Sequence, residues 1–333
     1  MSDEIWAITS YFNPMHWRRR SANYRVFREH LQFPLATVEL GYDDQFDLQQ
    51  DDAEILLRLT GGDIIWQKER LLNLALEALP ESCRSVLWID CDVVFQRVDL
   101  AEQISRQLDR VPLVQLFSLV HDLEPDALMN DLPTRTGIPR HSIPHRVAQG
   151  MSAADCLGKR HPGQLGVRSP GHAWAIRREL IAEHGFYDAG IVGGGDTALA
   201  CAGYGVFDEV MRLNCMNQRQ IEYYLAWAEP FYQSVQGKIS FVEGDLLHLW
   251  HGEPSNRRWF ERYGGLGPYC FDPFIDVALS DSGCWRWNTA KLALHEYVRS
   301  YFAARHEDGP LSEAALSRGE RPNQEKINLG HDF

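Results

Sequence analysis

The chain has 333 residues, of which 44% are hydrophobic and 24% are charged, a composition typical of a soluble globular protein. Its formal net charge of −13 argues against a nucleic acid as the main partner, although a metal ion can screen the phosphates of a single nucleotide. No apolar stretch approaches the roughly 20 residues of a membrane span, and the acidic start at 1–4 does not resemble a signal peptide, so we expect a cytoplasmic location.

In the first 120 residues, short apolar runs alternate with stretches whose apolar residues recur at helical spacing. The apolar runs predict strands at residues 5–9, 35–40, 86–89 and 111–117. The helical stripes predict helices at residues 18–31, 67–79 and 100–108. This alternation favours an α/β fold, in which a mostly parallel sheet carries helices on both faces. Ligands of such sheets bind beyond the carboxyl ends of the strands.

The composition changes at residues 121–170, which are rich in proline, histidine, aspartate and glycine, so we expect an irregular insertion there, such as a lid or an acceptor-binding loop. Regular structure is predicted again for residues 173–184, for a helix after 195, for a helix at 217–228, and for strands at 239–242 and 246–250. We expect a main domain at 1–265 and a C-terminal extension at 266–333, with a mobile tail from 309 onward.

Two carboxylates, Asp90 and Asp92, directly follow the predicted strand at 86–89. Acidic groups at the end of a buried strand are expensive to bury unless a positive group pairs with them. Mg²⁺ and Mn²⁺ take oxygen ligands and often share them with substrate phosphates. The Asp-x-Asp spacing therefore suggests a divalent metal that holds a diphosphate, although acidic residues also follow strands in ordinary turns.

Asp196 follows three glycines and opens a predicted helix. A glycine-rich backbone lets a ligand approach closely, and a carboxylate in that place could act as the general base that deprotonates an acceptor hydroxyl. The alternative is a structural one, in which Asp196 only caps the helix N-terminus.

Two histidines, His248 and His251, flank the end of the predicted strand at 246–250. Imidazole suits Mn²⁺ as a ligand, so we expect His251, and secondarily His248, to join the two aspartates on the metal. Trp174 is one of several tryptophans whose flat apolar face could stack on a sugar, with core packing as the alternative.

Four short motifs occur in a fixed order along the chain. They are Trp-Ile-Asp-Cys-Asp at 88–92, Gly-His-Ala-Trp-Ala-Ile-Arg-Arg at 171–178, Gly-Gly-Gly-Asp at 193–196 and His-Leu-Trp-His-Gly at 248–252. Together with the predicted sheet, they resemble a glycosyltransferase of the GT-A fold, and the middle of the chain is similar to the galactosyltransferase-like C-terminal region of that superfamily. The resemblance covers roughly residues 5–120 and 165–265, and it implies a Rossmann-type sheet.

The resemblance also implies a nucleotide-sugar donor held by a divalent metal, Mn²⁺ or Mg²⁺. Asp90 and Asp92 match the DxD motif, which meets the metal and the donor, and Asp196 matches the base of inverting members. His251 or His248 matches the metal-binding histidine of some members. Five further residues match positions that border the donor nucleotide: Thr9, Tyr11, Asn13, Arg70 and Asn73. Many galactosyltransferases have a tryptophan and consecutive acids where this chain has Gly-Gly-Gly-Asp-Thr, which leaves the acceptor type and the base open. Retaining enzymes of this fold need no such base, so both stereochemical courses stay open, and we favour inversion.

The predicted function is thus the metal-dependent transfer of a sugar from a nucleotide-sugar donor to an acceptor hydroxyl. The acceptor could be a glycan, a lipid-linked sugar or another hydroxyl compound. A nucleotidyltransferase is an alternative, but it should have an early glycine-rich phosphate loop, and residues 11–17 contain no glycine. A sugar-binding protein without catalytic activity is a second alternative.

Overall fold

The computed structural model describes residues 4–125, 135–158, 168–259 and 261–309. Its centre is a seven-stranded sheet with the order β11-β6-β10-β4-β1-β2-β3. The strands are β1 (Ile5–Phe12), β2 (Leu35–Leu40), β3 (Ile55–Leu59), β4 (Ser85–Ile89), β6 (Leu113–Gln115), β10 (Ala173–Arg177) and β11 (Ile239–Phe241). Strand β10 is antiparallel to both of its neighbours, and the other pairings are parallel. The predicted fold class, an α/β fold with a mostly parallel sheet, is confirmed.

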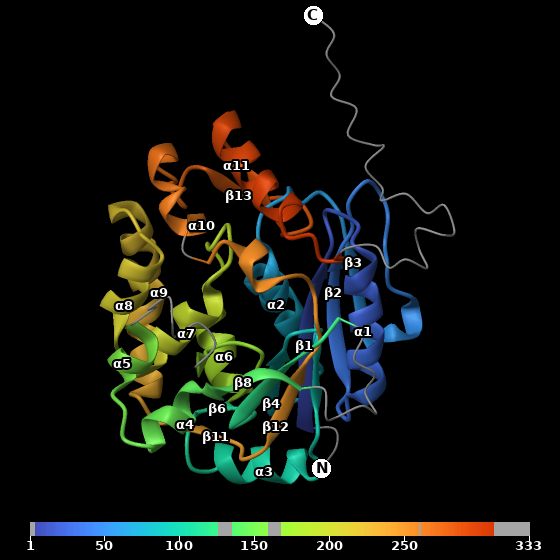
Figure 1. Cartoon of the computed structure of the whole chain (residues 1–333), viewed down its shortest axis with the longest axis vertical. Coiled ribbons are helices and arrows are strands. Elements are labelled where there is room, and N and C mark those ends of the chain that lie inside the picture. Colours follow the sequence, from blue (N-terminus) through green and yellow to red (C-terminus); the bar gives the residue numbers. More distant parts are fainter. Residues whose placement is uncertain (1–3, 126–134, 159–167, 260, 310–333) are drawn as a thin grey trace, which may run out of the picture.

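Helices cover both faces of this sheet (Figure 1). Alternate residues of β4 point to opposite faces, so Val86 and Trp88 join one hydrophobic core and Leu87 and Ile89 join the other. The second core contains α1 (Arg18–His30) and α3 (Leu100–Leu108). The first core includes residues of α2 (Lys68–Glu77), α6 (Arg178–His184), α7 (Gly195–Tyr204), α8 (Phe207–Leu213) and α9 (Gln218–Val235), among other helices.

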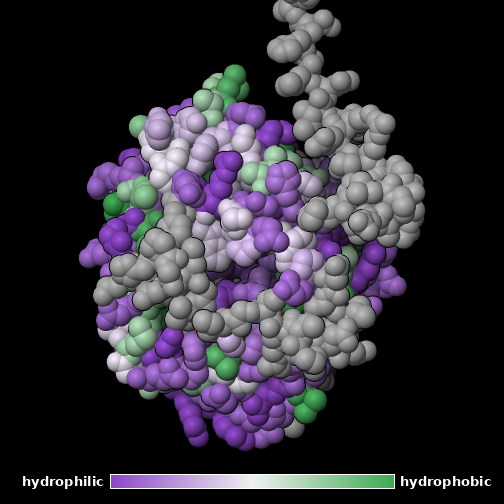
Figure 2. Space-filling view, in the orientation of Figure 1, coloured by the Kyte–Doolittle hydropathy of each residue, from purple (hydrophilic) through white to green (hydrophobic). Residues whose placement is uncertain are grey.

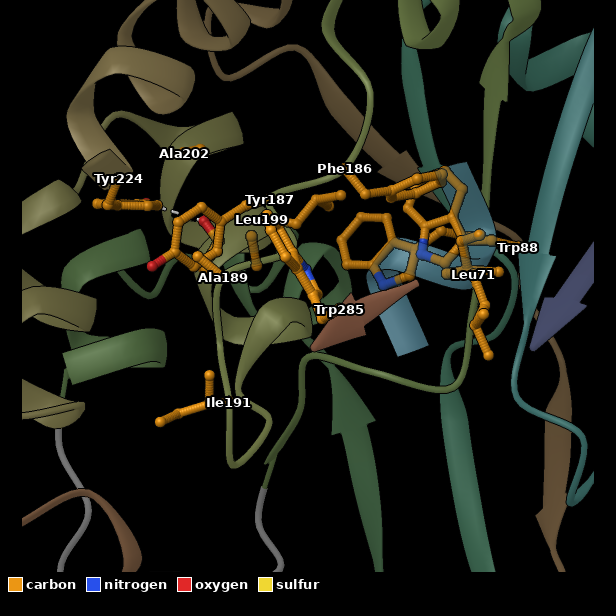
Figure 3. Close-up of a cluster of buried hydrophobic side chains, with 14 of the residues drawn as sticks. Leu71, Trp88, Phe186, Tyr187, Ala189, Ile191, Leu199, Ala202, Tyr224 and Trp285 are labelled. Atoms are coloured by element: carbon orange, nitrogen blue, oxygen red, sulfur yellow. Dashed lines mark hydrogen bonds between the residues drawn. The ribbon is translucent and has the colours of Figure 1, made fainter. Parts of the chain in front are cut away.

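Aromatic side chains fill the first core between β4 and the helices (Figure 3). Trp88 stacks on Trp174 with ring centroids 6.1 Å apart and meets the edge of Phe186 at 5.2 Å. Trp285, which lies almost 200 residues further along the chain than Trp88, joins the same cluster. Because such rings bury large apolar areas, this cluster fixes α2 against the sheet beside the end of β4.

A second sheet lies beyond the end of β4, with the strand order β5-β12-β7-β8-β9. Its strands are β5 (Val93–Phe95), β12 (Asp245–His248), β7 (Leu119–Leu123), β8 (Arg135–Ser142) and β9 (Arg168–Ser169). Three of these strands lie wholly or partly within the predicted irregular insertion, which also contains α4 (Ile143–Ala148) and α5 (Ala153–Gly158). The expectation of an irregular segment at 121–170 was therefore wrong for its described residues. The reason is that β7 is completed by pairing with β12, more than 120 residues away, which no local pattern reveals.

The C-terminal region packs on α2 and on the first core. It contains α10 (Glu261–Gly264), the hairpin β13 (Val277–Leu279) and β14 (Trp285–Trp287), and α11 (Leu292–Ala303). The side chain of Gln67 exchanges two hydrogen bonds with the backbone of Trp285, which anchors the hairpin to the start of α2. The boundary predicted at 265 stays a prediction, and the tail that we expect to be mobile, 309–333, lies outside the described residues except for Gly309. In the described part of the chain, no helix is both long and apolar enough to cross a membrane.

Candidate functional site

The carboxyl end of β4 brings Asp90 and Asp92 to the junction of the two sheets. The backbone N–H of Asp90 donates to the carbonyl of His172 at 2.7 Å, which ties it to the residue before β10. The carbonyl of Asp92 accepts from Leu249 at 2.8 Å, which ties it to the residue after β12. The order of the strands thus brings the second half of the chain to the acidic pair.

Asp92 lies beside the two predicted histidine ligands. Its Oδ2 is 3.4 Å from His251 Nε2, its Oδ1 is 3.8 Å from His248 Nε2, and the two imidazole Nε2 atoms are 2.8 Å apart. One ligand atom from each of the three residues lies within 4.8 Å of the others, so the group could hold a metal ion. Asp92 Oδ1 is buried and accepts no hydrogen bond from any residue that the structure describes. A buried carboxylate oxygen without a donor suits a cation.

His248 is held in place by a carboxylate that the sequence analysis did not select. Its Nδ1 is 2.7 Å from Asp122 Oδ1, and Arg140 binds the same carboxylate with nitrogens 2.5 and 3.0 Å from its oxygens. Burial alone would raise the pKa of Asp122, but the hydrogen bond and charge of His248, with the Arg140 guanidinium, hold it well below its usual range. An imidazole that donates one N–H to a carboxylate presents the other nitrogen to a metal, which is the usual outer support of a metal-binding histidine.

His251 is kept neutral by its surroundings. Burial first, and then the positive charge of Arg257, hold its pKa well below the usual value. Arg257 donates to the His251 ring, with Nη2 2.6 Å from Nε2. Burial also raises the pKa of Asp92, and the charge of His248 opposes that rise. One carboxylate with an unsatisfied oxygen and two imidazoles form a donor set that fits Mn²⁺ or another divalent transition metal.

Asp90 is not part of this donor set and instead faces a lysine. Lys68 Nζ is 2.6 Å from Asp90 Oδ1 and 2.9 Å from Asp196 Oδ1. One buried ammonium therefore joins the first acid of the Asp-x-Asp motif to the predicted base. The pKa of Lys68 is raised well above its usual value, because the charges of Asp196 and Asp90 outweigh the effect of burial. The role of Asp90 as a metal ligand stays a prediction, since Lys68 occupies one of its oxygens here.

Asp196 lies in the first turn of α7, where Gly194 and Gly195 let other side chains approach. Burial raises the pKa of Asp196, Lys68 opposes that rise, and the charge of Asp90 adds to it. Gly171 faces the same carboxylate, and a Cβ there would lie 2.9 Å from Asp196 Oδ2. The carboxylate of Asp196 therefore sits in a close-fitting polar site with a second acid nearby, which suits a group that must accept a proton.

Glu69 is a second carboxyl group that the sequence analysis missed. It is buried, it accepts from Trp66 Nε1 at 3.1 Å, and its Oε1 has no hydrogen-bond partner among the described residues. A Cβ on Gly195 would lie only 2.1 Å from that oxygen, so the glycine is needed for this packing. Burial raises the pKa of Glu69 to about 8, with Lys68 opposing the rise. In sequence, Lys68 and Glu69 resembled the solvated positions of a helix N-terminus, and no local signal distinguished them.

The predicted nucleotide-binding residues of β1 are engaged in other contacts. Thr9 donates its hydroxyl to the carbonyl of Ile89 at 2.6 Å. Tyr11 and Asn13 donate to the same oxygen of Asp47, at 2.6 and 2.8 Å. Asn13 also accepts from the backbone of Trp17 at 2.9 Å, which shapes the loop after β1. The polar groups of these residues are engaged within the protein, and their direct contact with a donor stays a prediction.

The remaining three predicted donor-binding residues are also committed to structural contacts. Arg70 donates from Nε to the carbonyl of Gly283 at 2.7 Å, and Asn73 exchanges hydrogen bonds with the backbone of Phe186. Trp174 is fully buried, and its Nε1 donates to the carbonyl of Pro170 at 2.9 Å. Its ring packs in the core, so this position does not support the prediction that it stacks on a sugar.

A small pocket opens beside Lys68, Glu69 and Asp196, with apolar walls that include Trp88, Phe186, Tyr187 and Leu199. A second pocket lies where the loop after β1 meets the C-terminal region, and Arg20, Trp66, Arg305 and Glu307 contribute to its walls. Figure 2 shows a hollow near the centre of the displayed face, with hydrophilic side chains beside it.

Neither a protein-family model nor a curated protein matches this sequence. The chain is similar to solved structures. The mannosyltransferase PcManGT from Pyrobaculum calidifontis, in complex with GDP-Man and Mn²⁺, has 12% identity and a TM-score of 0.41 over 95% of this chain and 79% of that chain. S. aureus TarS 1-349 with UDP-GlcNAc has 9% identity and a TM-score of 0.38 over 74% of this chain and 58% of that chain.

A 4-diphosphocytidyl-2C-methyl-D-erythritolsynthase from Anaerococcus prevotii DSM 20548 has 11% identity and a TM-score of 0.32 over 72% of this chain and 86% of that chain. The chain spans less than two thirds of the TarS chain, and all three TM-scores are below 0.5, so the overlaps are loose.

Proposed function

We propose that this chain is a metal-dependent glycosyltransferase that moves a sugar from a nucleotide-sugar donor to an acceptor hydroxyl with inversion. The observation that carries the proposal is the meeting of two groups at the carboxyl end of β4. One is the possible metal site of Asp92, His248 and His251, and the other is the Lys68-bridged pair of Asp90 and Asp196. Such a transfer requires a metal ion to stabilise the leaving group and a base to accept the proton of the acceptor, and these two groups would supply both.

Asp92, His248 and His251 would hold the metal, and Asp122 would keep the His248 ring in the tautomer that binds. A bound divalent ion would stabilise the charge that grows on a leaving nucleoside diphosphate. The low pKa of His251 keeps its imidazole neutral at neutral pH. Its Nε2 lone pair, which Arg257 Nη2 contacts at 2.6 Å, would bind the metal once Arg257 turns away.

Asp196 would accept the proton of the attacking acceptor hydroxyl at its carboxylate. Burial raises its pKa and so increases its affinity for a proton, while Lys68 keeps it ionised until the hydroxyl arrives. Lys68 holds Asp90 and Asp196 on one cation, which fixes the base relative to the donor end of the site. The pocket beside Asp196 is walled by apolar rings, and those rings would exclude water that could otherwise hydrolyse the donor.

The first experiment is thermal stabilisation by nucleoside diphosphates and nucleotide sugars, including GDP-mannose and UDP-GlcNAc, with Mn²⁺ or with EDTA. A ligand at a hundredfold excess over its dissociation constant should raise stability by about 2.7 kcal/mol. A shift that requires Mn²⁺ and disappears in Asp92→Asn supports the proposal. The nucleotide that causes the shift identifies the nucleobase of the donor. Asp245→Asn is the matched control, since Asp245 pairs with His121 at 3.0 Å in the same sheet.

Transfer is then measured with the identified donor and a panel of sugar and lipid-linked acceptors. Binding of a nucleotide sugar without transfer to any acceptor would favour a sugar-binding protein. Release of pyrophosphate from a nucleoside triphosphate and a sugar phosphate would favour a nucleotidyltransferase. The absence of any metal-dependent shift would refute the proposed function.

A further inference from the structure

Four arginine side chains gather next to the possible metal site, around Tyr301 and Glu307. Arg262 Nη1 and Arg305 Nη1 both donate to the Tyr301 hydroxyl, at 2.7 and 3.2 Å. Arg305 Nε is 2.5 Å from Glu307, and Arg20 Nη1 is 3.1 Å from the same carboxylate. The fourth arginine, Arg257, contacts the ring of His251. We call Arg20, Arg257, Arg262 and Arg305 the arginine cluster.

The arginine cluster contains more positive charge than its described neighbours neutralise. Glu307 is the one carboxylate that forms ion pairs with it among the described residues, and it serves two of the four guanidiniums. Arg262 instead contacts two phenol hydroxyls, those of Tyr301 and Tyr263, and Arg257 contacts an imidazole. The carboxylates of Asp92 and Asp196 act on the cluster only across longer distances.

The pKa of the Tyr301 hydroxyl reflects this excess of positive charge. Burial alone would raise its pKa, but the three guanidiniums of Arg262, Arg305 and Arg257 bring it below the usual value. Two arginine nitrogens, Arg20 Nε and Arg262 Nε, are buried without a hydrogen-bond acceptor among the described residues. Buried cations that lack counter-charges are costly, so the arrangement favours the binding of an anion.

Two of the four arginines of the cluster, Arg20 and Arg305, line a pocket. Arg20, Arg305 and Glu307 contribute to the walls of the second pocket, next to the aromatic rings of Trp66 and Phe302. At its other side, Arg257 touches His251, so an anion in the cluster would lie next to the possible metal site. The planar guanidinium of arginine can donate two parallel hydrogen bonds to two oxygens of a phosphate group, which suits arginine to phosphate binding.

We propose that the arginine cluster is an anion subsite that takes a phosphate group of a substrate, with Glu307 as the charge that the phosphate displaces. The inference rests on the proposed function only for the source of the phosphate. That source is either the diphosphate of the nucleotide-sugar donor or a phosphate on the acceptor. Binding of a phosphate itself requires neither metal nor transfer, so the two proposals can fail separately.

The test is the affinity of the full chain for inorganic pyrophosphate in EDTA, measured by calorimetry for the parent protein, Arg262→Gln and Arg257→Gln. Both variants should bind at least about tenfold more weakly, a change of about 1.4 kcal/mol, because each loses a charge-assisted hydrogen bond to the phosphate. Arg219→Gln is the matched control, because Arg219 is an exposed arginine that pairs with Glu222 and Asp272 outside the cluster. Its affinity should equal that of the parent.

A parent protein that does not bind pyrophosphate, or cluster variants that bind it like the parent, would overturn the inference. Circular dichroism tests whether each variant is folded. If Arg262→Gln does not fold, the pyrophosphate affinity of Arg257→Gln decides the test. A parallel titration with the nucleoside diphosphate and Mn²⁺ identifies the source. If the cluster variants lose as much affinity for the nucleoside diphosphate as for pyrophosphate, the bound phosphate is that of the donor. If they bind the nucleoside diphosphate like the parent, it is a phosphate on the acceptor.

Discussion

The support of His248 by Asp122 gives a prediction that separates metal binding from folding. In Asp122→Asn, the hydrogen bond at 2.7 Å loses its charge and the His248 tautomer is no longer fixed. Loss of such an outer partner typically weakens metal binding by about 10- to 100-fold. Because the Asp122 side chain is 46% exposed, water screens part of its charge. We therefore expect a loss of about 10- to 30-fold, which corresponds to about 1.4–2 kcal/mol.

The assay is a calorimetric titration of the folded chain with Mn²⁺ at neutral pH. Asp245→Asn provides the comparison, because it removes the charge from another carboxylate–histidine pair, His121 and Asp245, in the same sheet. Its Mn²⁺ affinity should match that of the parent protein. If Asp122→Asn binds Mn²⁺ as tightly as the parent, or if both variants lose affinity equally, then Asp122 does not support the metal site and the reasoning is wrong.

Four further variants test the acids around Lys68 and the metal site. Asp92→Ala should abolish metal-dependent donor binding yet leave the melting temperature in EDTA unchanged or higher, because burial disfavours the ionised Asp92; a clear loss of stability would contradict this. Asp196→Asn should bind donor normally and lose transfer, and retained transfer would exclude it as the base. Lys68→Met should lower the free energy of unfolding in urea by about 3–5 kcal/mol, since it leaves two carboxylates without their cation. Burial holds the pKa of Glu69 near 8, so the folded chain keeps a proton that the unfolded chain releases above about pH 4.5. Stability should therefore fall as pH rises from about 4.5 to 8, and a plot of melting temperature against pH should be flatter for Glu69→Gln than for the parent. Identical plots for the two proteins would show that Glu69 is ionised.

The features of the fold and site that could be predicted from the sequence depend on residues that lie close together along the chain. The apolar run of β4, the stripe of α2 and the two acids after β4 follow from local spacing, and His248 and His251 lie within one short motif. The structure brings Asp92, His248 and His251 together because β5 and β12 are neighbours in the second sheet.

The residues that sequence analysis missed are defined by tertiary contacts. Lys68 and Glu69 resemble a polar helix start, and only the approach of α7 through Gly195 buries them. Asp122 stands in a segment whose composition resembles a loop, because its strand is completed by a distant partner. The hydroxyl and amide donors of Thr9 and Asn73 looked available for a ligand, but backbone carbonyls of distant segments accept their protons.

The short segment after α11 has a consequence for how the protein is made. Asp308 accepts from the backbone N–H of Arg19 at 2.8 Å, so it caps the beginning of α1, and 289 positions separate the two residues. Residues 305–307 also lie against Gly252, which directly follows His251. A ribosome adds about 5–20 residues per second, so α1 must wait about 15–60 s for this partner after it emerges. We expect the nascent chain to form the central sheet first and to complete the arginine cluster and the surroundings of His251 only when this segment leaves the exit tunnel.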